Sequence, residues 1–171
     1  MDSASCNGVA DGTATANGIT GGNGINSFSW NTTPLQTTNP ATGLAAGNYT
    51  ITVTDQKGCF TTRDTTVLEP FLLVIDTTFQ DSVSCNGLFD GTASVVASGG
   101  NGIYSYLWSD GQTTATASNL TAGTYNVTIT DQKGCFKDTS VTVLEPDALL
   151  IASMSMDSAS CNGVADGTAT A

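Results

Sequence analysis

The first sixteen residues of the chain, 1–16, recur without a single change as its last sixteen, 156–171. Equivalent positions such as Met1 and Met156 therefore lie 155 residues apart, which defines a superperiod of that length. Such identity is typical of recent duplication within a long repetitive protein, and it favours an extended repeat architecture over a single compact catalyst. We expect Met1 to be an internal methionine, as its counterpart Met156 is.

A shorter repeat of about 76 residues divides each superperiod. Its markers are a CNG segment beginning at Cys6, Cys85 and Cys161, a TDQKGC segment at 54–59 and 130–135, and an LEP segment at 68–70 and 144–146. Proline ends strand pairing, so each LEP segment is expected to mark a junction. The predicted parts are a first repeat at 1–70, whose own first strand begins before residue 1, a complete second repeat at 71–146, and the start of a further repeat at 147–171.

The pattern of apolar residues predicts an all-β chain. Apolar and polar residues alternate with period two at 49–54 and 125–130, as expected of strands with one buried face. Asn-Gly, Asp-Gly and Gly-Gly pairs between such runs favour tight turns. In the second repeat we predict strands near 71–85, 91–98, 103–109, 113–118, 124–130 and 135–144. Short strands at this spacing indicate a β-sandwich of the seven-strand type.

Two aromatic positions indicate that the sandwich is immunoglobulin-like. Trp108 fits the buried tryptophan of the third strand, and Tyr125 fits the tyrosine corner that opens a later strand. Trp30 and Tyr49 take the same places in the first repeat. An antibody domain would carry cysteine where Val127 stands, so the disulfide between its sheets is not expected. The predicted fold is a head-to-tail array of immunoglobulin-like β-sandwiches.

Composition and charge exclude several classes of function. The chain has 15 acidic and 4 basic residues and a net charge of −11, which argues against a nucleic-acid partner. It has no apolar run of the length that direct membrane insertion needs. Histidine is absent, so neither a conventional Ser-His or Cys-His nucleophile nor a usual zinc site is available. We predict no enzymatic activity and no cofactor.

Five cysteines at repeated positions favour export and disulfide formation. One interpretation pairs Cys6 with Cys59 and Cys85 with Cys135, within each repeat. The other pairs Cys6 with Cys135, because the two cysteines of one sandwich are expected at opposite poles, roughly 25 Å apart for an eight-residue strand. A disulfide requires a Cα separation of about 4.4–6.8 Å. In that second interpretation Cys85 reaches a cysteine beyond residue 171. Cys161 is the fifth candidate. Free thiols are a third alternative, and all three interpretations stay open.

Four aspartates at repeated positions are weak candidates for calcium ligands, because extracellular repeats often use this ion. These residues are Asp11, Asp55, Asp90 and Asp131. The alternative is that they are turn formers, whose side chains bond to neighbouring backbone groups. The spacing of a calcium-binding DxDxDG loop is missing from the sequence, which favours the turn interpretation.

The combination of CNGxxDGT, GGNG, an aromatic strand ending in Trp, LxAGxY, TDQKGC and LEP resembles the SprB repeat family. That resemblance covers essentially the whole chain and implies an immunoglobulin-like fold, a place on the cell surface of Bacteroidota and a fibre role. It further implies export by the type IX secretion route, as for gliding-motility adhesins, and it implies no catalytic residues. Asn26 departs from the pattern, since the second repeat has the aromatic Tyr104 there.

Asp-Ser and Asp-Thr triplets resemble the O-glycosylation sequon that Bacteroidota use on exported proteins. The candidate acceptors are Ser3, Ser82, Ser158, Thr65 and Thr77. The alternative is chance occurrence, because such triplets are common in Thr-rich strands.

The leading functional prediction is a structural segment of a giant extracellular fibre or adhesin, with copies of itself as partners along and across the fibre. The rival is a carbohydrate- or ligand-binding module, in which Tyr104, Tyr106 and Phe89 would stack on sugar. Replacement of Tyr104 by Asn26 in the first repeat argues against that rival. A self-associating sheath is a third possibility, and the distal surface or glycan ligand is not specified by the sequence.

Overall fold

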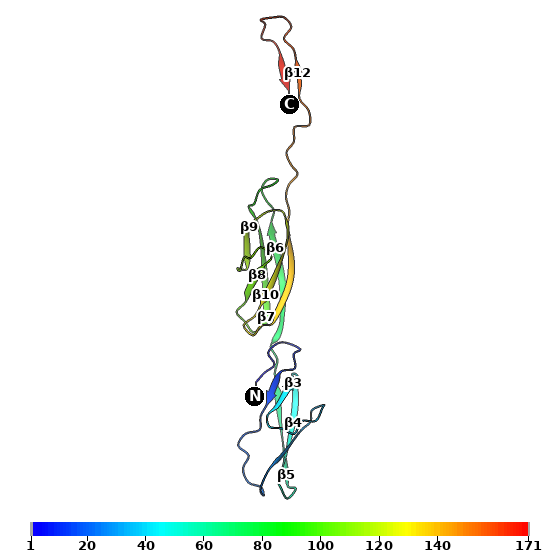
Figure 1. Ribbon diagram of the computed structural model, residues 1–171, viewed down its shortest axis with the longest axis vertical. Helices are drawn as coiled ribbons and strands as arrows, with labels where there is room; N and C mark the ends of the chain where they lie inside the picture. Colours follow the sequence, from blue (N-terminus) through cyan, green and yellow to red (C-terminus); the bar gives the residue numbers. More distant parts are fainter. Residues whose placement is uncertain (1, 171) are drawn as a thin grey trace.

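The computed structural model describes residues 2–170, which form an elongated all-β molecule (Figure 1). Two separate hydrophobic cores lie one after the other along its length, and a thin extension follows the second. Among the described residues, no helix is long and apolar enough to cross a membrane.

The second repeat contains two three-stranded antiparallel sheets. Its strands are β6 (Phe71–Asp81), β7 (Gly91–Gly100), β8 (Ser105–Trp108), β9 (Thr116–Leu120), β10 (Gly123–Thr130) and β11 (Phe136–Val143). One sheet has the order β6-β7-β9 and the other β11-β10-β8. These orders match the ABE and CFG strands of the immunoglobulin fold. The predicted all-β, immunoglobulin-like sandwich is therefore confirmed.

The six strands predicted for this repeat are all present at bounds close to the predicted ones, which leaves one fewer than the seven of the immunoglobulin constant type. The missing strand corresponds to the fourth, or D, strand of an immunoglobulin domain. Only residues 109–115 connect β8 to β9. A strand usually has about 5–6 residues, so this connection is too short for another strand and its two turns.

The core of the second repeat forms around Trp108, which is 1% exposed and donates its indole N–H to the Thr114 carbonyl at 2.9 Å. Val127 and Ile129 of β10 alternate with threonines, and their side chains are buried beside the tryptophan. Burying each such aliphatic side chain stabilises the fold by about 1.5–3 kcal/mol. The predicted role of Trp108 is confirmed, and Trp30 is equally buried in the first repeat.

The predicted tyrosine corner is present in both repeats. Tyr125 donates its hydroxyl hydrogen bond to the Thr121 carbonyl at 3.1 Å, and Tyr49 donates to the Ala45 carbonyl at 3.0 Å. Each bond fastens the start of a strand, β10 or its counterpart in the first repeat, to the turn before it. This is the contact that defines the corner in immunoglobulin-like sandwiches.

The first repeat has the same plan with a shorter set of strands. They are β1 (Gly12–Ala14), β2 (Ser27–Trp30), β3 (Ala41–Leu44), β4 (Gly47–Thr54) and β5 (Phe60–Val67). Their sheets have the orders β1-β3 and β2-β4-β5. Residues 2–70 contain no counterpart of β6 beyond an isolated bridge between Asp2 and Thr13. The strand that would pair with this counterpart is also short. It is β1, which has 3 residues, whereas the equivalent β7 of the second repeat has 10.

Beyond the second core, residues 147–170 form an extension that is exposed throughout. It ends in a hairpin of β12 (Ser155–Asp157) and β13 (Thr168–Thr170), the thin tip of the molecule in Figure 1. Asp157 pairs with Thr168 in this hairpin, as Asp81 pairs with Thr92 in the second repeat. The same Asp–Thr pairing also joins Asp2 to Thr13 in the first repeat. The strand pairing on either side of the CNG loop therefore has the same register in all three copies.

Candidate functional site

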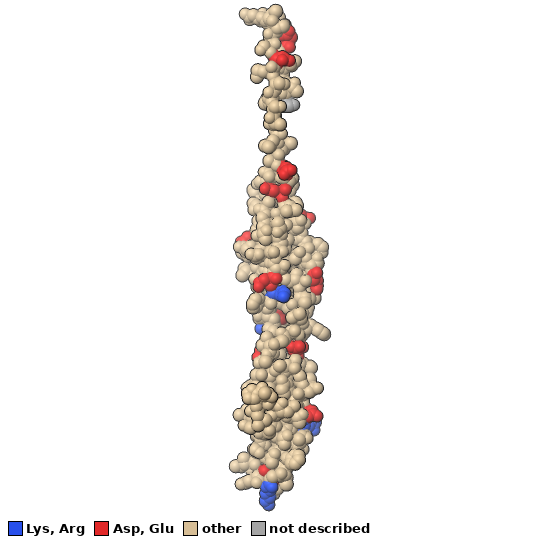
Figure 2. All heavy atoms as spheres, turned by 90° about the vertical axis from the view of Figure 1, so that its right-hand side faces the viewer, with Lys and Arg blue, Asp and Glu red and all other residues tan. Residues whose placement is uncertain are grey.

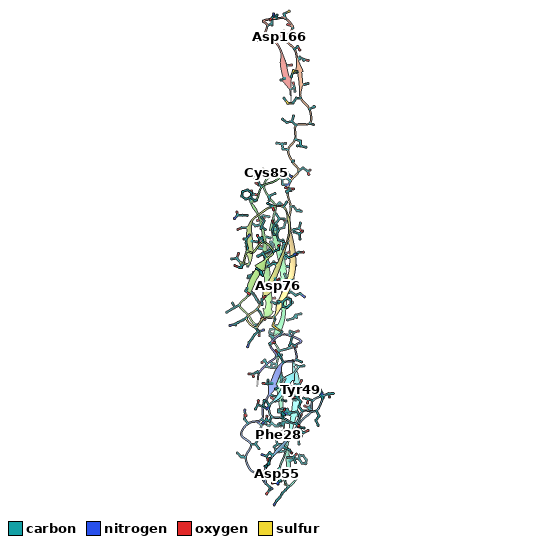
Figure 3. The ribbon with its side chains drawn as sticks, in the orientation of Figure 1. Phe28, Tyr49, Asp55, Asp76, Cys85 and Asp166 are labelled. Carbon is teal, nitrogen blue, oxygen red and sulfur yellow. A yellow bond between two sulfur atoms is a disulfide. The ribbon has the colours of Figure 1, made fainter. Side chains whose placement is uncertain are left out.

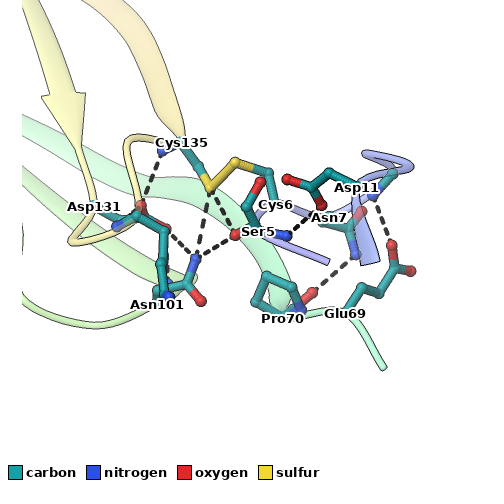
Figure 4. The surroundings of a disulfide bond; sticks show 11 residues. Ser5, Cys6, Asn7, Asp11, Glu69, Pro70, Asn101, Asp131 and Cys135 are labelled. Carbon is teal, nitrogen blue, oxygen red and sulfur yellow. Dashed lines mark hydrogen bonds between the residues drawn. A yellow bond between two sulfur atoms is a disulfide. The ribbon is translucent and has the colours of Figure 1, made fainter. Parts of the chain in front are cut away.

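The junction between the two repeats is the candidate functional site, because a disulfide crosses it. Cys6 of the first repeat is bonded to Cys135 of the second, with their Cα atoms 5.7 Å apart (Figure 4). Cys59, Cys85 and Cys161 are free and exposed. The structure thus contains the pairing between neighbouring repeats.

Pairing within each repeat, Cys6 with Cys59 and Cys85 with Cys135, was wrong. Cys6 precedes β1 at the pole of the first repeat that faces the junction, whereas Cys59 lies in the turn between β4 and β5 at the opposite pole. β4 has 8 residues, which separates the poles by roughly 25 Å. That distance is several times the Cα separation that a disulfide allows.

On the second-repeat side, Asp131 holds the turn that presents Cys135. One carboxylate oxygen accepts the backbone N–H groups of Lys133 and Cys135, each at 2.9 Å. The other oxygen accepts the backbone N–H of Asn101 at 2.8 Å and its side-chain amide at 2.9 Å. The Asp131 side chain, which is only 5% exposed, thus accepts four hydrogen bonds. They fix the turn and the GGNG loop to each other.

These hydrogen bonds decide the charge state of Asp131. Burial by itself raises the pKa of the carboxyl, but the hydrogen bonds from Asn101, Cys135 and Lys133 outweigh it and hold the pKa below its ordinary value. In the first repeat, the side chain of Asn23 is the largest cause of the lowered pKa of Asp55. Both aspartates are therefore ionised at neutral pH.

Asn101 also connects the two repeats. Its side-chain amide donates to the Ser5 carbonyl at 2.8 Å, beside the disulfide (Figure 4). The same nitrogen lies 3.6 Å from the Cys135 sulfur. The Asn101 side chain therefore contacts Asp131 of its own repeat, the disulfide and the preceding repeat.

On the first-repeat side, the LEP segment holds the loop that presents Cys6. Asn7 donates its side-chain amide to the Pro70 carbonyl at 3.1 Å, and the Gly8 N–H donates to the Glu69 carboxylate at 2.6 Å. The Ser5 N–H donates to Asp11 at 2.7 Å. Sequence reasoning treated Glu69 only as part of a junction and gave Asn7 and Asn101 no role. The signal that could have found them is their recurrence within the cysteine-bearing motifs.

The same contacts recur at cysteines that are not bonded. In the loop of Cys85, Asn86 donates to the Pro146 carbonyl at 3.1 Å and the Gly87 N–H donates to Glu145 at 3.0 Å. In the turn of Cys59, Asp55 accepts the Lys57 and Cys59 N–H groups, each at 2.9 Å. The Ser160 N–H donates to Asp166 at 2.9 Å beside Cys161. Each loop and turn therefore has its shape before any disulfide forms.

The four aspartates proposed as weak calcium candidates serve turns in this structure. Asp11 and Asp90 each accept the N–H of a serine six residues earlier, and Asp55 and Asp131 hold the cysteine turns. Within residues 2–170 no three His, Cys, Asp or Glu side chains are grouped as a metal site requires. The bonds are those of turn-forming aspartates.

The glycosylation candidates differ in accessibility. Ser3, Ser82, Ser158 and Thr77 are exposed, whereas Thr65 is half-buried. Glycosylation at these positions stays a prediction.

The aromatic side chains of the rival sugar-binding interpretation do not share one surface. Tyr104 and Tyr106 are half-buried against the core, and Tyr104 donates its hydroxyl hydrogen bond to the Gly99 carbonyl at 2.7 Å. Phe89 is 67% exposed in the loop that follows Cys85, at the other pole of the repeat. A stacking platform needs rings side by side on an accessible face, and these three residues do not provide it.

Charge is distributed thinly along the surface. On the face shown in Figure 2, acidic side chains are scattered over the length of the molecule and basic ones are few. The visible face carries no basic patch.

The fold and the junction together define a class: an immunoglobulin-like β-sandwich repeat that is covalently linked to the repeat beside it. A family model described as "SprB repeat" matches residues 77–113, from β6 to the turn after β8. The match supports the resemblance that the motifs indicated.

Comparison with curated proteins found no match. Among solved structures, the chain is similar to the amphioxus IgVJ-C2 molecule, with a TM-score of 0.39 and 14% identity, over 84% of this chain and 99% of that one. It is also similar to the N-terminal eight Ig domains of Down Syndrome Cell Adhesion Molecule (DSCAM) isoform 1.30.30. There the TM-score is 0.37 and the identity 13%, over 92% of this chain and 23% of that one. The fold assignment rests on strand order and the tyrosine corner.

Proposed function

We propose that this chain is a non-catalytic structural segment of a giant extracellular fibre or adhesin, in which sandwich repeats are joined head to tail and linked by disulfides. The observation that carries the proposal is the Cys6–Cys135 disulfide across the junction. The two elements that carry these cysteines, the CNG loop and the TDQKGC turn, have the same hydrogen bonds in the first and the second repeat.

The junction is suited to transmitting force rather than to swivelling. Only residues 68–70 separate the end of β5 from the start of β6. The disulfide and the bond from Asn101 to Ser5 add two further contacts across the same boundary. Three connections at one pole restrict rotation between repeats, whereas a single flexible linker would leave it free.

Both ends of the two-repeat unit carry the parts of another junction. Figure 3 labels Asp55, whose turn presents the free Cys59, near one end of the molecule, and Cys85 at the far end of the second repeat. In the proposed fibre, Cys59 pairs with the CNG cysteine of the preceding repeat. Cys85 and Cys161 pair with TDQKGC cysteines of following repeats.

An extracellular location on the cell surface agrees with these features. Disulfides persist in oxidising compartments and are rare in the cytosol. The resemblance to SprB repeats adds the expectations of a bacterial surface filament, export by the type IX route and a part in gliding or attachment. The stalk would hold an adhesive or hook-like region away from the cell.

The test is immuno-electron microscopy of the native cell surface and its shed material, with antibody raised to this chain. Labelled fibres with an axial repeat on the order of 60–80 Å per superperiod, from strand rise plus linker, are expected. Antibody absorbed with the purified chain is the control and should leave the fibres unlabelled. Label on compact soluble particles without an axial repeat would overturn the proposal.

A further inference from the structure

The loop of Cys6 and the turn of Cys135 contact each other through groups other than their sulfur atoms. The side-chain amide of Asn101 donates to the carbonyl of Ser5, the residue directly before Cys6, at 2.8 Å. The same nitrogen donates to the Asp131 carboxylate, which holds the turn of Cys135, at 2.9 Å. One amide therefore joins the two segments that carry the bonded cysteines, and neither of its hydrogen bonds requires the sulfurs to be linked.

Charges on the two sides of the junction also favour contact. Asp11 accepts the Ser5 N–H within the loop of Cys6, and Lys133 belongs to the turn of Cys135 in the other repeat. The hydrogen bonds from Ser5 are the main cause of the lowered pKa of Asp11, and the positive charge of Lys133 lowers it further. Both side chains are exposed, so salt screens their attraction.

The shape of each loop and turn does not depend on the disulfide. The unbonded Cys85 has the loop hydrogen bonds of Cys6, and the unbonded Cys59 has the turn hydrogen bonds of Cys135. The chain therefore places each cysteine before oxidation. Two repeats that dock through Asn101 would hold the two thiols next to each other.

The docked cysteines can be reached from solvent. Cys6 and Cys135 are half-buried, and both line an open pocket of about 270 Å³ at the junction. Phe71, Phe136 and Lys137 line the same pocket. A small disulfide such as oxidised glutathione can approach the sulfurs from this side, and a nearby lysine favours the thiolate, which is the reactive form of cysteine. Docking and oxidation are therefore compatible.

We propose that Asn101 is the positioning residue of the crosslink, docking the loop of Cys6 onto the turn of Cys135 while both cysteines are still thiols. Oxidation then joins these two sulfurs in preference to any other pair, because the docked geometry raises the effective concentration of one thiol at the other. The inference rests on the proposed function, since it concerns how the link between repeats forms.

The oxidant is a disulfide of low molecular weight, and the reaction is thiol–disulfide exchange. One cysteine thiolate attacks the small disulfide, which forms a mixed disulfide and releases one small thiol. The second cysteine thiolate then attacks the protein sulfur of the mixed disulfide, which closes the Cys6–Cys135 bond and releases the second small thiol. The two protein thiols lose two electrons and two protons in total, and both are recovered in the two small thiols.

Equilibration with glutathione tests the inference on the full 171-residue chain. Cys59, Cys85 and Cys161 are first replaced by serine, so that a single pair of thiols remains. The reduced protein is equilibrated with mixtures of oxidised and reduced glutathione, and the bonded fraction is measured by mass spectrometry after quenching in acid. Asn101→Ala should lower the effective concentration of the two thiols by roughly 2- to 12-fold, the contribution of one net hydrogen bond.

Asn23→Ala is the matched control. Asn23 has the same place in the GGNG loop of the first repeat and donates its backbone N–H and its side-chain amide to Asp55, each at 2.9 Å. These contacts lie at the pole of the first repeat away from the junction (Figure 3), so the variant should keep the effective concentration of the parent. Lys133→Gln should lower that concentration at low salt only, and Lys57→Gln should leave it unchanged.

Hydrogen exchange separates docking from a role in shaping the turn. The Lys133 and Cys135 N–H groups donate to the other oxygen of Asp131, so Asn101→Ala should leave both amides protected. A lower effective concentration with retained protection supports the inference. An unchanged effective concentration would overturn it, and so would loss of protection at these amides, because Asn101 would then act only on its own turn. Fibres with the expected axial repeat would be seen by electron microscopy in either case, so the fibre proposal is tested separately.

Discussion

Asp131 shows how one residue can organise a junction. Its carboxylate accepts four N–H groups from two loops that are 30 residues apart in sequence. Charge-assisted hydrogen bonds of this kind are stronger than neutral ones, and they compensate the cost of burying the charge. The turn that presents Cys135 therefore keeps its hydrogen bonds as long as Asp131 stays ionised.

This dependence gives a prediction for pH. The pKa of Asp131 is lower in the folded protein than its ordinary value of 3.8. Its stabilisation is therefore complete above that ordinary value and is lost as the pH falls through the lower, folded pKa. Asp131→Asn should lower the melting temperature at pH 7, and the difference from the parent should shrink in strong acid. Melting curves recorded by circular dichroism from pH 7 to pH 2 measure this.

The control for that prediction is Asp147→Asn, which removes an exposed carboxylate outside both cores. It should melt with the parent at every pH. A difference between Asp131→Asn and the parent that stays constant down to pH 2 would contradict the assigned role of the charge.

Gly100 gives a second prediction at the scale of single residues. Its φ is +59°, and an added Cβ would lie 2.7 Å from a carboxylate oxygen of Asp131. Gly102 has a similar φ of +69°, but nothing lies within 4 Å of its added Cβ. The backbone penalty of a left-handed alanine, about 1–2 kcal/mol, applies to both positions. Gly100→Ala should therefore lower the free energy of unfolding in urea by more than Gly102→Ala, and equal losses would count against the tight contact with Asp131.

At the scale of strands and loops, the disulfide should stabilise the pair of repeats. It closes a loop with a sequence separation of 129 residues, and such crosslinks typically stabilise by about 2–4 kcal/mol. The variant Cys6→Ser with Cys135→Ser should lose about that much in urea unfolding. Both cores should remain folded, because neither cysteine belongs to them. Loss of the link should also broaden the distribution of angles between repeats in small-angle X-ray scattering.

Cys59→Ser with Cys85→Ser is the matched control, since it removes the same number of thiols from positions that are free. That variant should unfold and scatter as the parent does. Stability and scattering that are equal in all three proteins would show that the crosslink does not restrain the junction.

Much of the fold at this scale could be predicted from local pattern. Val127 and Ile129 alternate with threonine, and alternation is a property of one strand that needs no knowledge of its neighbours. The tryptophan and tyrosine corner could be recognised for the same reason, because each depends on residues close in sequence. The six predicted strands of the second repeat match the observed ones to within a few residues, because Gly, Asn and Asp pairs mark the turns between them.

The site was harder to predict, because it forms between distant parts of the chain. Topology suggested that Cys6 meets Cys135, but spacing alone allowed the pairing with Cys59 equally well. Asn101 could not be assigned its contact with Ser5, since 96 residues separate them and no local signal joins them.

At the scale of the whole molecule, the two ends are different and complementary. One end presents the Asp55 turn with the free Cys59. The other end presents the loop of Cys85 and the exposed segment that follows the second core. Interfaces of this kind generate open chains, whereas an interface that pairs with itself gives closed dimers. In the proposed fibre, this difference between the ends would give the assembly its polarity.

The disulfide also determines how such a molecule would respond to tension. When the chain is pulled from its ends, force passes through the Cys6–Cys135 bond, and the residues between the two cysteines carry none of it. Unfolding then cannot extend the 129 residues that the bond spans. At 3.3–3.6 Å per extended residue, the oxidised chain should stop roughly 430–460 Å short of the reduced chain.

Single-molecule pulling of the 171-residue chain, before and after addition of a reductant, measures this difference directly. Cys6→Ser with Cys135→Ser should reach the full length without reductant, and Cys59→Ser with Cys85→Ser should keep the shorter length. Equal lengths for the oxidised and reduced chains would mean that no covalent bond carries the load across the junction. The expected shortening would mean that each bond protects about 1.7 repeats from extension, since it spans 129 residues of a chain whose repeat has about 76. Successive bonds along a fibre would enclose overlapping stretches of chain. A fibre built in this way resists stretching even when its sandwiches lose their hydrogen bonds, which is the property that a stalk under tension requires.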